Sequence, residues 1–334
     1  MTTTVQKVSC LLGALLFLVT DIVQSRSADQ ATSNSLTDRI SPKEGLEGWL
    51  ALFDGKSTFG FQDGKLDDSR KPSTLQGGTT TSEFSDYELH VLVVKAGKIT
   101  LGDESTELRA GATTLICNGK RGPVRLSSDL VVESLNLKPL ELKSLFNGRD
   151  LTGWERRGRV PSPTKPGATW TVSNGAIQVL GGPEALEYAP SNSEHLFNDF
   201  VAQLVVCMKR DGANGGVFLR NEPGRTMMGY EIQLHNTWYE PGGKIHGYTT
   251  GGIDDRQQAR AAVAVDHVPF RLTIVANGPH LATWVNGYQT ADWTDTRPMN
   301  SNPRNGLRLE KGTFQLQAHD PETKLEFQGI WLKE

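Results

Sequence analysis

The chain has 334 residues, of which 37% are hydrophobic and 22% charged, and its formal net charge is -3. The length allows two domains or one large β domain, and the composition is that of a globular protein. We see no basic stripe of the kind that nucleic-acid binding requires, so neither a nucleic acid nor an anionic membrane is expected as a partner.

The first segment of the chain is predicted to be a secretory signal peptide, residues 1–27. Lys7 precedes an apolar run from Val8 to Val19, and small residues follow at Ser25 and Ser27. A membrane anchor is the alternative, but the run is shorter than the ~20 apolar residues of a transmembrane helix. We therefore expect a secreted or periplasmic protein with no membrane span in the mature chain. The polar residues 28–48 are predicted to form a linker.

The rest of the chain has the pattern of short strands separated by Gly, Asn and Asp turns. Asn-Gly pairs at 277–278 and 286–287 supply the positive φ angles that tight hairpins need. The predicted strands are 87–94, 199–208, 215–220, 229–235, 270–276, 281–286, 313–319 and 325–332. This pattern predicts an all-β sandwich.

An internal repeat divides the chain. Residues 49–62 (WLALFDGKSTFGFQ) resemble 142–155 (LKSLFNGRDLTGWE), and 82–95 resemble 194–209. We interpret 49–140 as a truncated copy of a full domain at 141–334. The truncated copy has no counterpart of GGVFLR or GYEIQLH, so chemistry carried by those strands belongs to the full copy.

Three predicted strands of the full copy carry unusual polar rows. The rows are Glu231, Gln233 and His235 in GYEIQLHN; Gln315, Gln317 and His319 in TFQLQAHD; and Arg220, on the same face as Phe218, in GGVFLRN. An ordinary solvated face is the alternative, because the outer face of a sandwich sheet is usually wet. These side chains bind hydroxyl groups or transfer protons, so we predict a concave site where the strands meet. Trp238, Tyr239 and Trp284 are either aromatic platforms for sugar rings or core residues.

The loop Gly251–Arg260 (GGIDDRQQAR) is interpreted as a solvated loop, with a calcium site or a cover over a ligand as alternatives. Cys117 and Cys207 lie in apolar runs and are predicted to be free thiols, with a disulfide as the alternative. No cysteine or histidine spacing typical of zinc occurs.

The full copy resembles the domain family once called DUF1080, the 3-keto-disaccharide hydrolase domain. The resemblance runs from Leu145 to Glu334 and includes LFNGRDLTGW, NGGVFLRNEPG, GYEIQLHN and GTFQLQAHDPETKLEFQGIWLKE. It implies a concanavalin A-like jelly-roll sandwich, export, and action on an oligosaccharide or glycoside oxidised at C3. Such a sugar can lose its C2 proton to a base and then eliminate the C1 aglycone, so a pair of glycosidase carboxylates is not needed.

The resemblance gives each candidate residue an expected role. Glu231 and His319 are the catalytic pair, one as base and the other as acid. The expected substrate ligands are Arg220, Gln233, His235, Gln317 and Arg256, with Asp320 supporting His319. No cofactor is predicted, although a divalent metal at Glu231 and the histidines is an alternative without recognised ligand spacing. A non-catalytic carbohydrate-binding module of the cell surface or periplasm is the alternative function, and the oligomeric state stays open.

Overall fold

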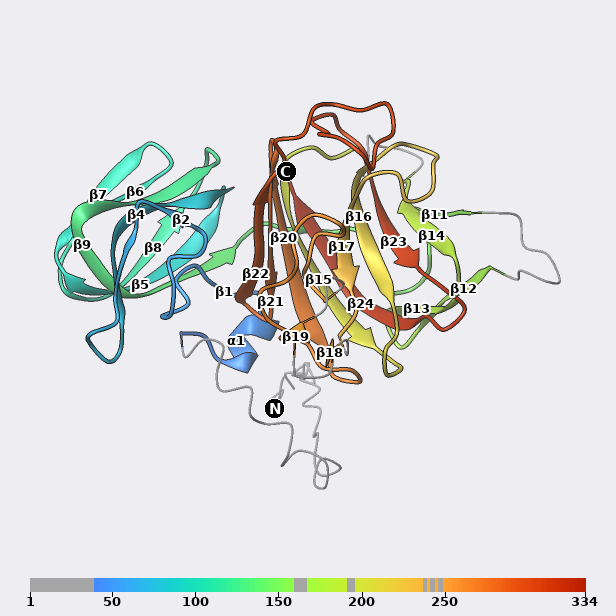
Figure 1. The fold of residues 1–334 in the computed structure, drawn as a ribbon, viewed down its shortest axis with the longest axis horizontal. Helices are drawn as coiled ribbons and strands as arrows, with labels where there is room; N and C mark the ends of the chain where they lie inside the picture. The colour runs from blue at the N-terminus through green and yellow to red at the C-terminus, as the bar shows by residue number, and fades with distance from the viewer. Residues whose placement is uncertain (1–38, 159–166, 191–195, 237–238, 241–243, 246–248) are drawn as a thin grey trace, which may run out of the picture. The chain divides into compact units, whose positions relative to one another are not determined.

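The computed structural model describes residues 39–158, 167–190, 196–236, 239–240, 244–245 and 249–334. Within these ranges the chain forms one short helix and twenty-four strands (Figure 1). The predicted signal peptide lies outside the described residues. The segment predicted as a linker contains the helix α1 (Pro42–Leu46), because Ser41 caps the Glu44 N–H and the Glu44 carboxylate accepts from the Ser41 N–H. Among the described residues, no helix has the length and hydropathy of a membrane span.

The first nine strands form one antiparallel sheet, with the central order β2-β4-β9-β5-β8. They are β1 (Leu50–Ala51), β2 (Phe61–Gln62), β3 (Lys65–Asp67), β4 (Thr74–Phe84), β5 (Tyr87–Lys95), β6 (Gly97–Leu101), β7 (Glu104–Leu108), β8 (Gly111–Cys117) and β9 (Gly122–Pro139). In β5 the side chains alternate, so that Tyr87, Leu89 and Val91 are buried. This alternation is the pattern that predicted a strand at 87–94.

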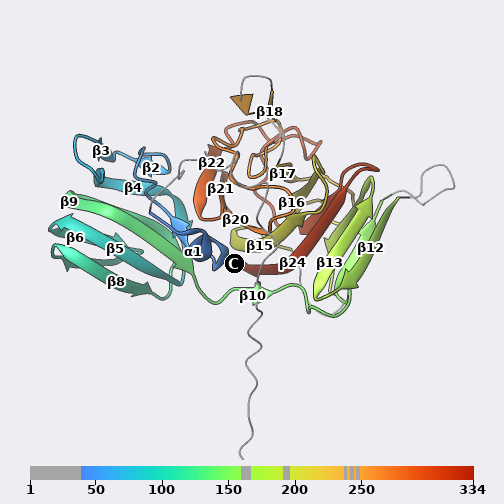
Figure 2. The same cartoon turned by 90° about the horizontal axis from the view of Figure 1, so that it is seen from below.

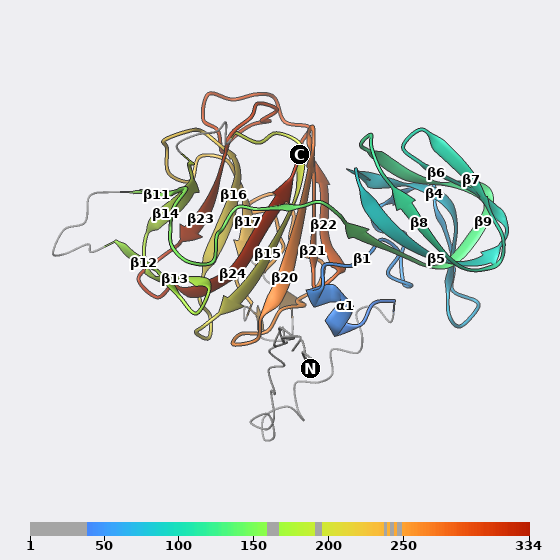
Figure 3. The same ribbon diagram turned by 180° about the vertical axis from the view of Figure 1, so that it is seen from behind.

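An eight-stranded sheet forms one layer of the second part of the chain, with the order β12-β13-β24-β15-β20-β21-β22 and β10 paired to β24 (Figure 3). Its strands are β10 (Lys143–Ser144), β12 (Ala168–Ser173), β13 (Ala176–Gly181), β15 (Phe200–Met208), β20 (Phe270–Asn277), β21 (His280–Val285), β22 (Tyr288–Thr294) and β24 (Lys324–Lys333).

A five-stranded sheet faces it, with the order β11-β14-β23-β16-β17. Two of its strands, β16 and β17, are labelled in Figure 2 above β15 and β24 of the eight-stranded sheet. Its strands are β11 (Trp154–Arg157), β14 (Glu184–Tyr188), β16 (Gly215–Asn221), β17 (Tyr230–Leu234) and β23 (Thr313–Ala318). A separate two-stranded ribbon consists of β18 (Tyr239–Glu240) and β19 (Lys244–Ile245). All eight predicted strands correspond to observed strands, and the predicted all-β sandwich is confirmed.

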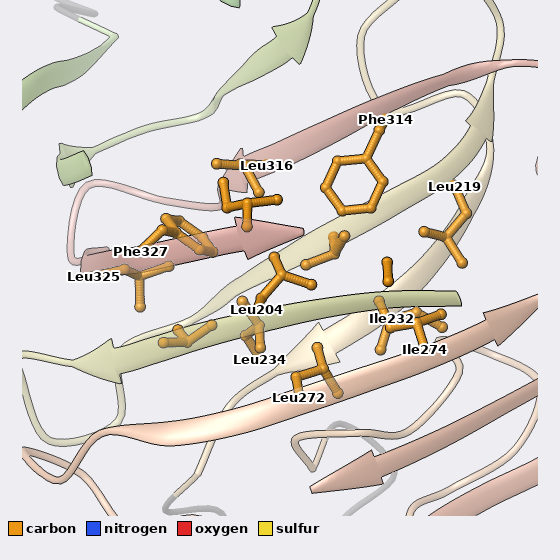
Figure 4. Close-up of a cluster of buried hydrophobic side chains, with 14 of the residues drawn as sticks. Leu204, Leu219, Ile232, Leu234, Leu272, Ile274, Phe314, Leu316, Leu325 and Phe327 are labelled. Carbon is orange, nitrogen blue, oxygen red and sulfur yellow. The ribbon is translucent and has the colours of Figure 1, made fainter. Parts of the chain in front are cut away.

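The hydrophobic core lies between the eight-stranded and five-stranded sheets (Figure 4). Five core residues from the eight-stranded sheet are Leu204, Leu272, Ile274, Leu325 and Phe327, and five from the facing sheet are Leu219, Ile232, Leu234, Phe314 and Leu316. Ile232 and Leu234 are fully buried. Burying such a side chain stabilises the fold by about 1.5–3 kcal/mol. The apolar row of GYEIQLHN therefore points inward, and its polar row points out of the sandwich.

The interpretation of 49–140 as a truncated copy stays a proposal, and the strand pairing offers a parallel to it. The short strand β1 pairs antiparallel with β9, as β10 pairs with β24. The strand β5 also pairs with β9, as β15 pairs with β24. The segments that resemble one another in sequence thus make matching pairs. Cys117, which is half-buried, and Cys207, which is buried, are both free thiols.

Candidate active site

The polar row of β17 is buried, although it lies on the outer face of the five-stranded sheet. Glu231 is 6% exposed, Gln233 3% and His235 7%. An ordinary outer strand face is solvated, so these polar groups are covered by other parts of the chain. The structure therefore excludes the interpretation of this row as a plain wet surface.

The loop Gly251–Arg260 covers the free edge of β17 by pairing with it. The Gln233 N–H donates to Gly252 O at 2.9 Å, and the Gly251 N–H donates to Gln233 O at 3.0 Å. The Asp254 N–H donates to Glu231 O at 3.0 Å. The loop is thus fixed to the sheet edge and is not the solvated loop that we predicted. Backbone pairing with β17 brings Asp254 beside Glu231.

A cleft of about 740 Å³ opens beside this strand. Six of the predicted site residues line it: Glu231, Gln233, His235, Gln317, His319 and Asp320. Further lining residues include Asn214, Asp254, Asp255, Arg304 and, at the mouth, Arg210, Asp211 and Glu322. The strands β17 and β23 thus bring two of the three predicted polar rows to one cleft.

Glu231 shares one guanidinium nitrogen with Asp254. Arg304 Nη2 lies 3.0 Å from Glu231 Oε2 and 2.9 Å from Asp254 Oδ2. Burial, together with the Asp254 charge, raises the pKa of Glu231 to about 7, although Arg304 and His319 oppose the increase. Burial and the neighbouring Asp255 likewise raise the pKa of Asp254. A carboxyl group that ionises near neutral pH is suited to act as a general base.

Arg304 is a site residue that the sequence analysis missed. It lies outside any strand, in the segment between β22 and β23. Its guanidinium lies 5.3 Å from the centre of the Phe218 ring, and its backbone oxygen accepts a hydrogen bond from Arg256 Nη2. No strand pattern marks this position in the sequence. Arg304 is recognised as a site residue only when the structure brings Glu231 and Asp254 together around it.

Arg256 and Arg220 do not line the cleft, which corrects two predicted substrate ligands. Arg256 lies behind Arg304 and fixes its backbone. Arg220 is 1% exposed. Its guanidinium donates to the backbone oxygens of Asn198, Gly278 and Arg308 and to the Asp199 carboxylate. Arg220 is therefore a structural residue that bonds loops to one another.

The prediction that Arg220 binds the substrate is wrong because β16 is locally irregular. The register between β16 and β23 shifts after Phe218, and Arg220 has a φ angle of 47°. Alternation of side chains requires a regular strand, and a left-handed residue at a bulge redirects its side chain. Phe218 keeps its predicted face, where it lies under Arg304, whereas Arg220 leaves it.

His319 and Asp320 follow the end of β23 and line the cleft as predicted. His319 Nδ1 lies 2.9 Å from Asp320 Oδ2, and the His319 side chain is 45% exposed. The backbone N–H groups of both residues donate to Thr323 Oγ1. A carboxylate that binds Nδ1 leaves Nε2 as the other proton-carrying nitrogen, which suits a residue that transfers protons at a cleft wall.

Neither aromatic platform nor metal site is found among the residues that the structure describes. Trp284 is 1% exposed and packs in the second hydrophobic cluster, near Phe84, so it is a core residue. Trp238 and the Tyr239 side chain lie outside the described residues. The described cleft lining contains no Phe, Tyr or Trp. No group of three or more His, Cys, Asp or Glu in the described part of the chain is arranged to hold a metal ion.

Comparisons with known proteins follow the same division of the chain. The family model described as a 3-keto-alpha-glucoside-1,2-lyase-like domain matches residues 141–333, more than half of the chain. No curated protein matches the chain.

Three of the solved structures that are similar to this chain are described next. Two are crystal structures from Parabacteroides distasonis ATCC 8503, each described as a "putative glycosyl hydrolase" and 18% identical. The first covers 57% of this chain and 93% of that chain with a TM-score of 0.44, and the second covers 58% and 99% with 0.45. The third is the carbohydrate binding module CBM66 from Bacillus subtilis, 14% identical, covering 55% and 96% with a TM-score of 0.38. Scores this low carry no argument about the reaction, so the family match stands on its own.

Proposed function

Because the chain belongs to the 3-keto-alpha-glucoside-1,2-lyase-like domain family, we propose that it cleaves glycosides that are oxidised at C3. The C3 ketone acidifies the C2–H bond, and a base that removes this proton generates an enolate. The enolate electrons then form the C1=C2 double bond, and the C1–O bond breaks with loss of the protonated aglycone. Addition of water across the new double bond completes a net hydrolysis.

The observation that carries this proposal is the state of Glu231. Its carboxyl group lines the cleft, and its pKa is raised to about 7. A base is most effective when its pKa is close to the working pH, because it is then both ionised and strongly basic. Elimination needs one such base, whereas ordinary glycosidases need two carboxyl groups at a fixed separation on either side of the bond.

Arg304 is the cation that lies beside the proposed base. Its guanidinium is fixed by Glu231 and Asp254 and lies over the Phe218 ring. A preorganised cation beside the base stabilises the negative charge that develops on the C3 oxygen. His319, oriented by Asp320, is the candidate acid that protonates the departing C1 oxygen.

Non-catalytic carbohydrate binding is the second candidate function. The amide side chains of Gln233 and Gln317 on the cleft wall favour it, because amides bind sugar hydroxyls.

Export is proposed for both candidate functions, on the basis of the predicted signal peptide. Mass analysis of the exported chain for cleavage near Ser27 tests it.

The test of the proposed function compares wild type with Glu231→Gln on a 3-keto-glucoside. Released aglycone and sugar products are measured by mass spectrometry, and Glu310→Gln, an exposed glutamate of the segment that carries Arg304, is the control. We expect Glu231→Gln to lose roughly 10²–10⁴ of the turnover, which is the usual contribution of a general base, and Glu310→Gln to lose none. Near-normal turnover by Glu231→Gln would remove Glu231 from the mechanism. A protein that retains the unoxidised glycoside and leaves the 3-keto form intact would be a binding module.

A further inference from the structure

A glycine in the middle of a strand, Gly216, lies beneath the side chains of Glu231 and Gln317, which both line the cleft. Gly216 lies on β16, opposite Gln233 on β17 and opposite Gln317 on β23. A Cβ atom at this position would lie 2.8 Å from Glu231 Oε1 and 2.9 Å from Gln317 Oε1. Both distances are below van der Waals contact, so the carboxylate and amide oxygens occupy the space above the bare backbone of Gly216.

The backbone conformation at position 216 does not require a glycine. The φ angle of Gly216 is not positive, whereas Gly212 and Gly224, on either side of the strand, have positive φ angles. Any residue can adopt the backbone angles of a regular strand, and a glycine there weakens the strand. The absent side chain therefore has a different use, which is to leave room for the Glu231 and Gln317 oxygens above the backbone of Gly216.

One of these oxygens is without a protein partner. Gln317 is 4% exposed, and its Oε1 atom is buried without a hydrogen-bond partner among the described residues. Its Nε2 atom contacts Met227 Sδ at 3.5 Å. The neighbouring amides are engaged, since Gln233 Nε2 donates to Asn214 Oδ1 at 2.6 Å and Gln315 Oε1 accepts from the Met227 N–H at 3.0 Å. A buried acceptor without a partner is costly unless a ligand supplies the donor.

We propose that Gly216 and Gln317 form a subsite for the C2 hydroxyl of the oxidised sugar, so that the protein acts on 3-keto glycosides with a free 2-hydroxyl group. This inference rests on the proposed function, because Glu231 removes the hydrogen bound to the same carbon. When the C2 hydrogen points at Glu231, the hydroxyl on C2 is its immediate neighbour, and Gln317 Oε1 is the acceptor across Gly216.

The subsite predicts which related sugars fail. A 2-deoxy sugar leaves Gln317 Oε1 buried without a donor, and a site built to bind a hydroxyl discriminates strongly against an analogue that lacks it. The 2-hydroxyl group is therefore the feature of the sugar for which this subsite selects.

The experiment measures kcat/KM for a 3-keto-glucoside and for its 2-deoxy analogue. The analogue keeps a hydrogen on C2 and the C1 leaving group, so elimination remains chemically possible. We expect wild type to prefer the 2-hydroxy substrate by about 100-fold, because the 2-deoxy analogue leaves a buried acceptor without its donor. Gln317→Leu is expected to remove most of this preference, because the leucine side chain cannot accept the hydrogen bond from the 2-hydroxyl group. The surface variant Gln328→Leu is the matched control.

Gly216→Ala gives a second test, in which both substrates are lost while the thermal unfolding curve shows a folded protein. Wild type that cleaves both substrates equally well would overturn the subsite and leave the proposed function standing. A preference that survives in Gln317→Leu would also overturn it. Wild type that cleaves neither substrate would overturn the proposed function and the subsite together.

Discussion

Replacing Asp254 with asparagine removes one of the two carboxylates that bind Arg304. In the wild type, Glu231 and Asp254 both contact Arg304 Nη2, at 3.0 and 2.9 Å. The charged or titratable groups near Glu231 are Asp254 on the edge loop, Arg304, His319 directly after β23, and His235 directly after β17. The Asp254→Asn substitution keeps the shape of the side chain and removes only its charge.

The size of the effect follows from the shared nitrogen. Because both oxygens contact one atom, they lie no more than about 6 Å apart, and two unit charges at that separation repel by roughly 3 kcal/mol at an effective dielectric constant of about 20. Arg304 already offsets part of this repulsion. Without Asp254 the full Arg304 charge is available to Glu231, so the pKa of Glu231 falls from its value of about 7. We expect the acid limb of the pH profile to move down by about one pH unit.

The assay is kcat/KM against pH, from pH 5 to 9, on a 3-keto-glucoside. Glu231 acts as a base only when ionised, so activity rises as the pH passes through its pKa. For Asp254→Asn the rise comes at lower pH, and the plateau falls because a weaker base removes the proton. Asp211→Asn is the control, since it removes a charge from the same cleft where the carboxylate is 86% exposed and pairs with His267. An acid limb that does not move in Asp254→Asn, or that moves to higher pH, refutes the reasoning.

Three further predictions concern stability and proton transfer. The pKa of Glu231 is raised from 4.5 to about 7, so the wild type loses stability as the pH rises through this range. Glu231→Gln is therefore expected to be more stable than wild type by roughly 3 kcal/mol at pH 8 and no more stable at pH 4. The free energy of unfolding in urea measures this difference, and equal stability at pH 8 contradicts a buried, ionised Glu231. His319→Ala is expected to slow release of alkyl aglycones by about 100-fold and to affect a nitrophenolate aglycone little, because a good leaving group needs no acid; equal effects on both would exclude His319 as the acid. Asp54, which is 4% exposed, binds Arg260 at 2.7 Å. Asp54→Asn is expected to lower the free energy of unfolding by about 2 kcal/mol, since it leaves a partly buried cation without its partner, whereas Asp103→Asn in an exposed ion pair is expected to change nothing measurable.

The strands, and the site residues that β17 and β23 carry, could be predicted because the alternation of apolar and polar residues is a local pattern in the sequence. Alternation with a period of two places Ile232 in the core and Glu231 on the opposite face, and it does the same for Leu316 and Gln317. The convergence of β17 and β23 on one cleft then follows from the sheet order, with β16 between them.

The remaining site residues could not be predicted, because their positions depend on tertiary contacts. Arg220 was expected in the site and is not there, because it lies at a register shift of β16 that the alternation of side chains does not reveal. Asp254 reaches the site through backbone bonds between a loop and a strand edge, and those bonds carry no side-chain signature. Arg304 comes from an irregular segment whose position is set by Arg256 and Phe218. The sequence therefore predicts Glu231, the proposed base, but not Arg304, the cation that accompanies it.

The central claim is that Glu231 removes a proton from C2 of a 3-keto sugar. It is tested most directly by competition between a 3-keto-glucoside and the same compound carrying deuterium at C2, with aglycone release followed by mass spectrometry. If the C2 bond breaks in the step that commits the sugar to cleavage, wild type consumes the light substrate several times faster and Glu231→Gln consumes neither. Equal consumption of both isotopic forms, with aglycone released, would contradict the account.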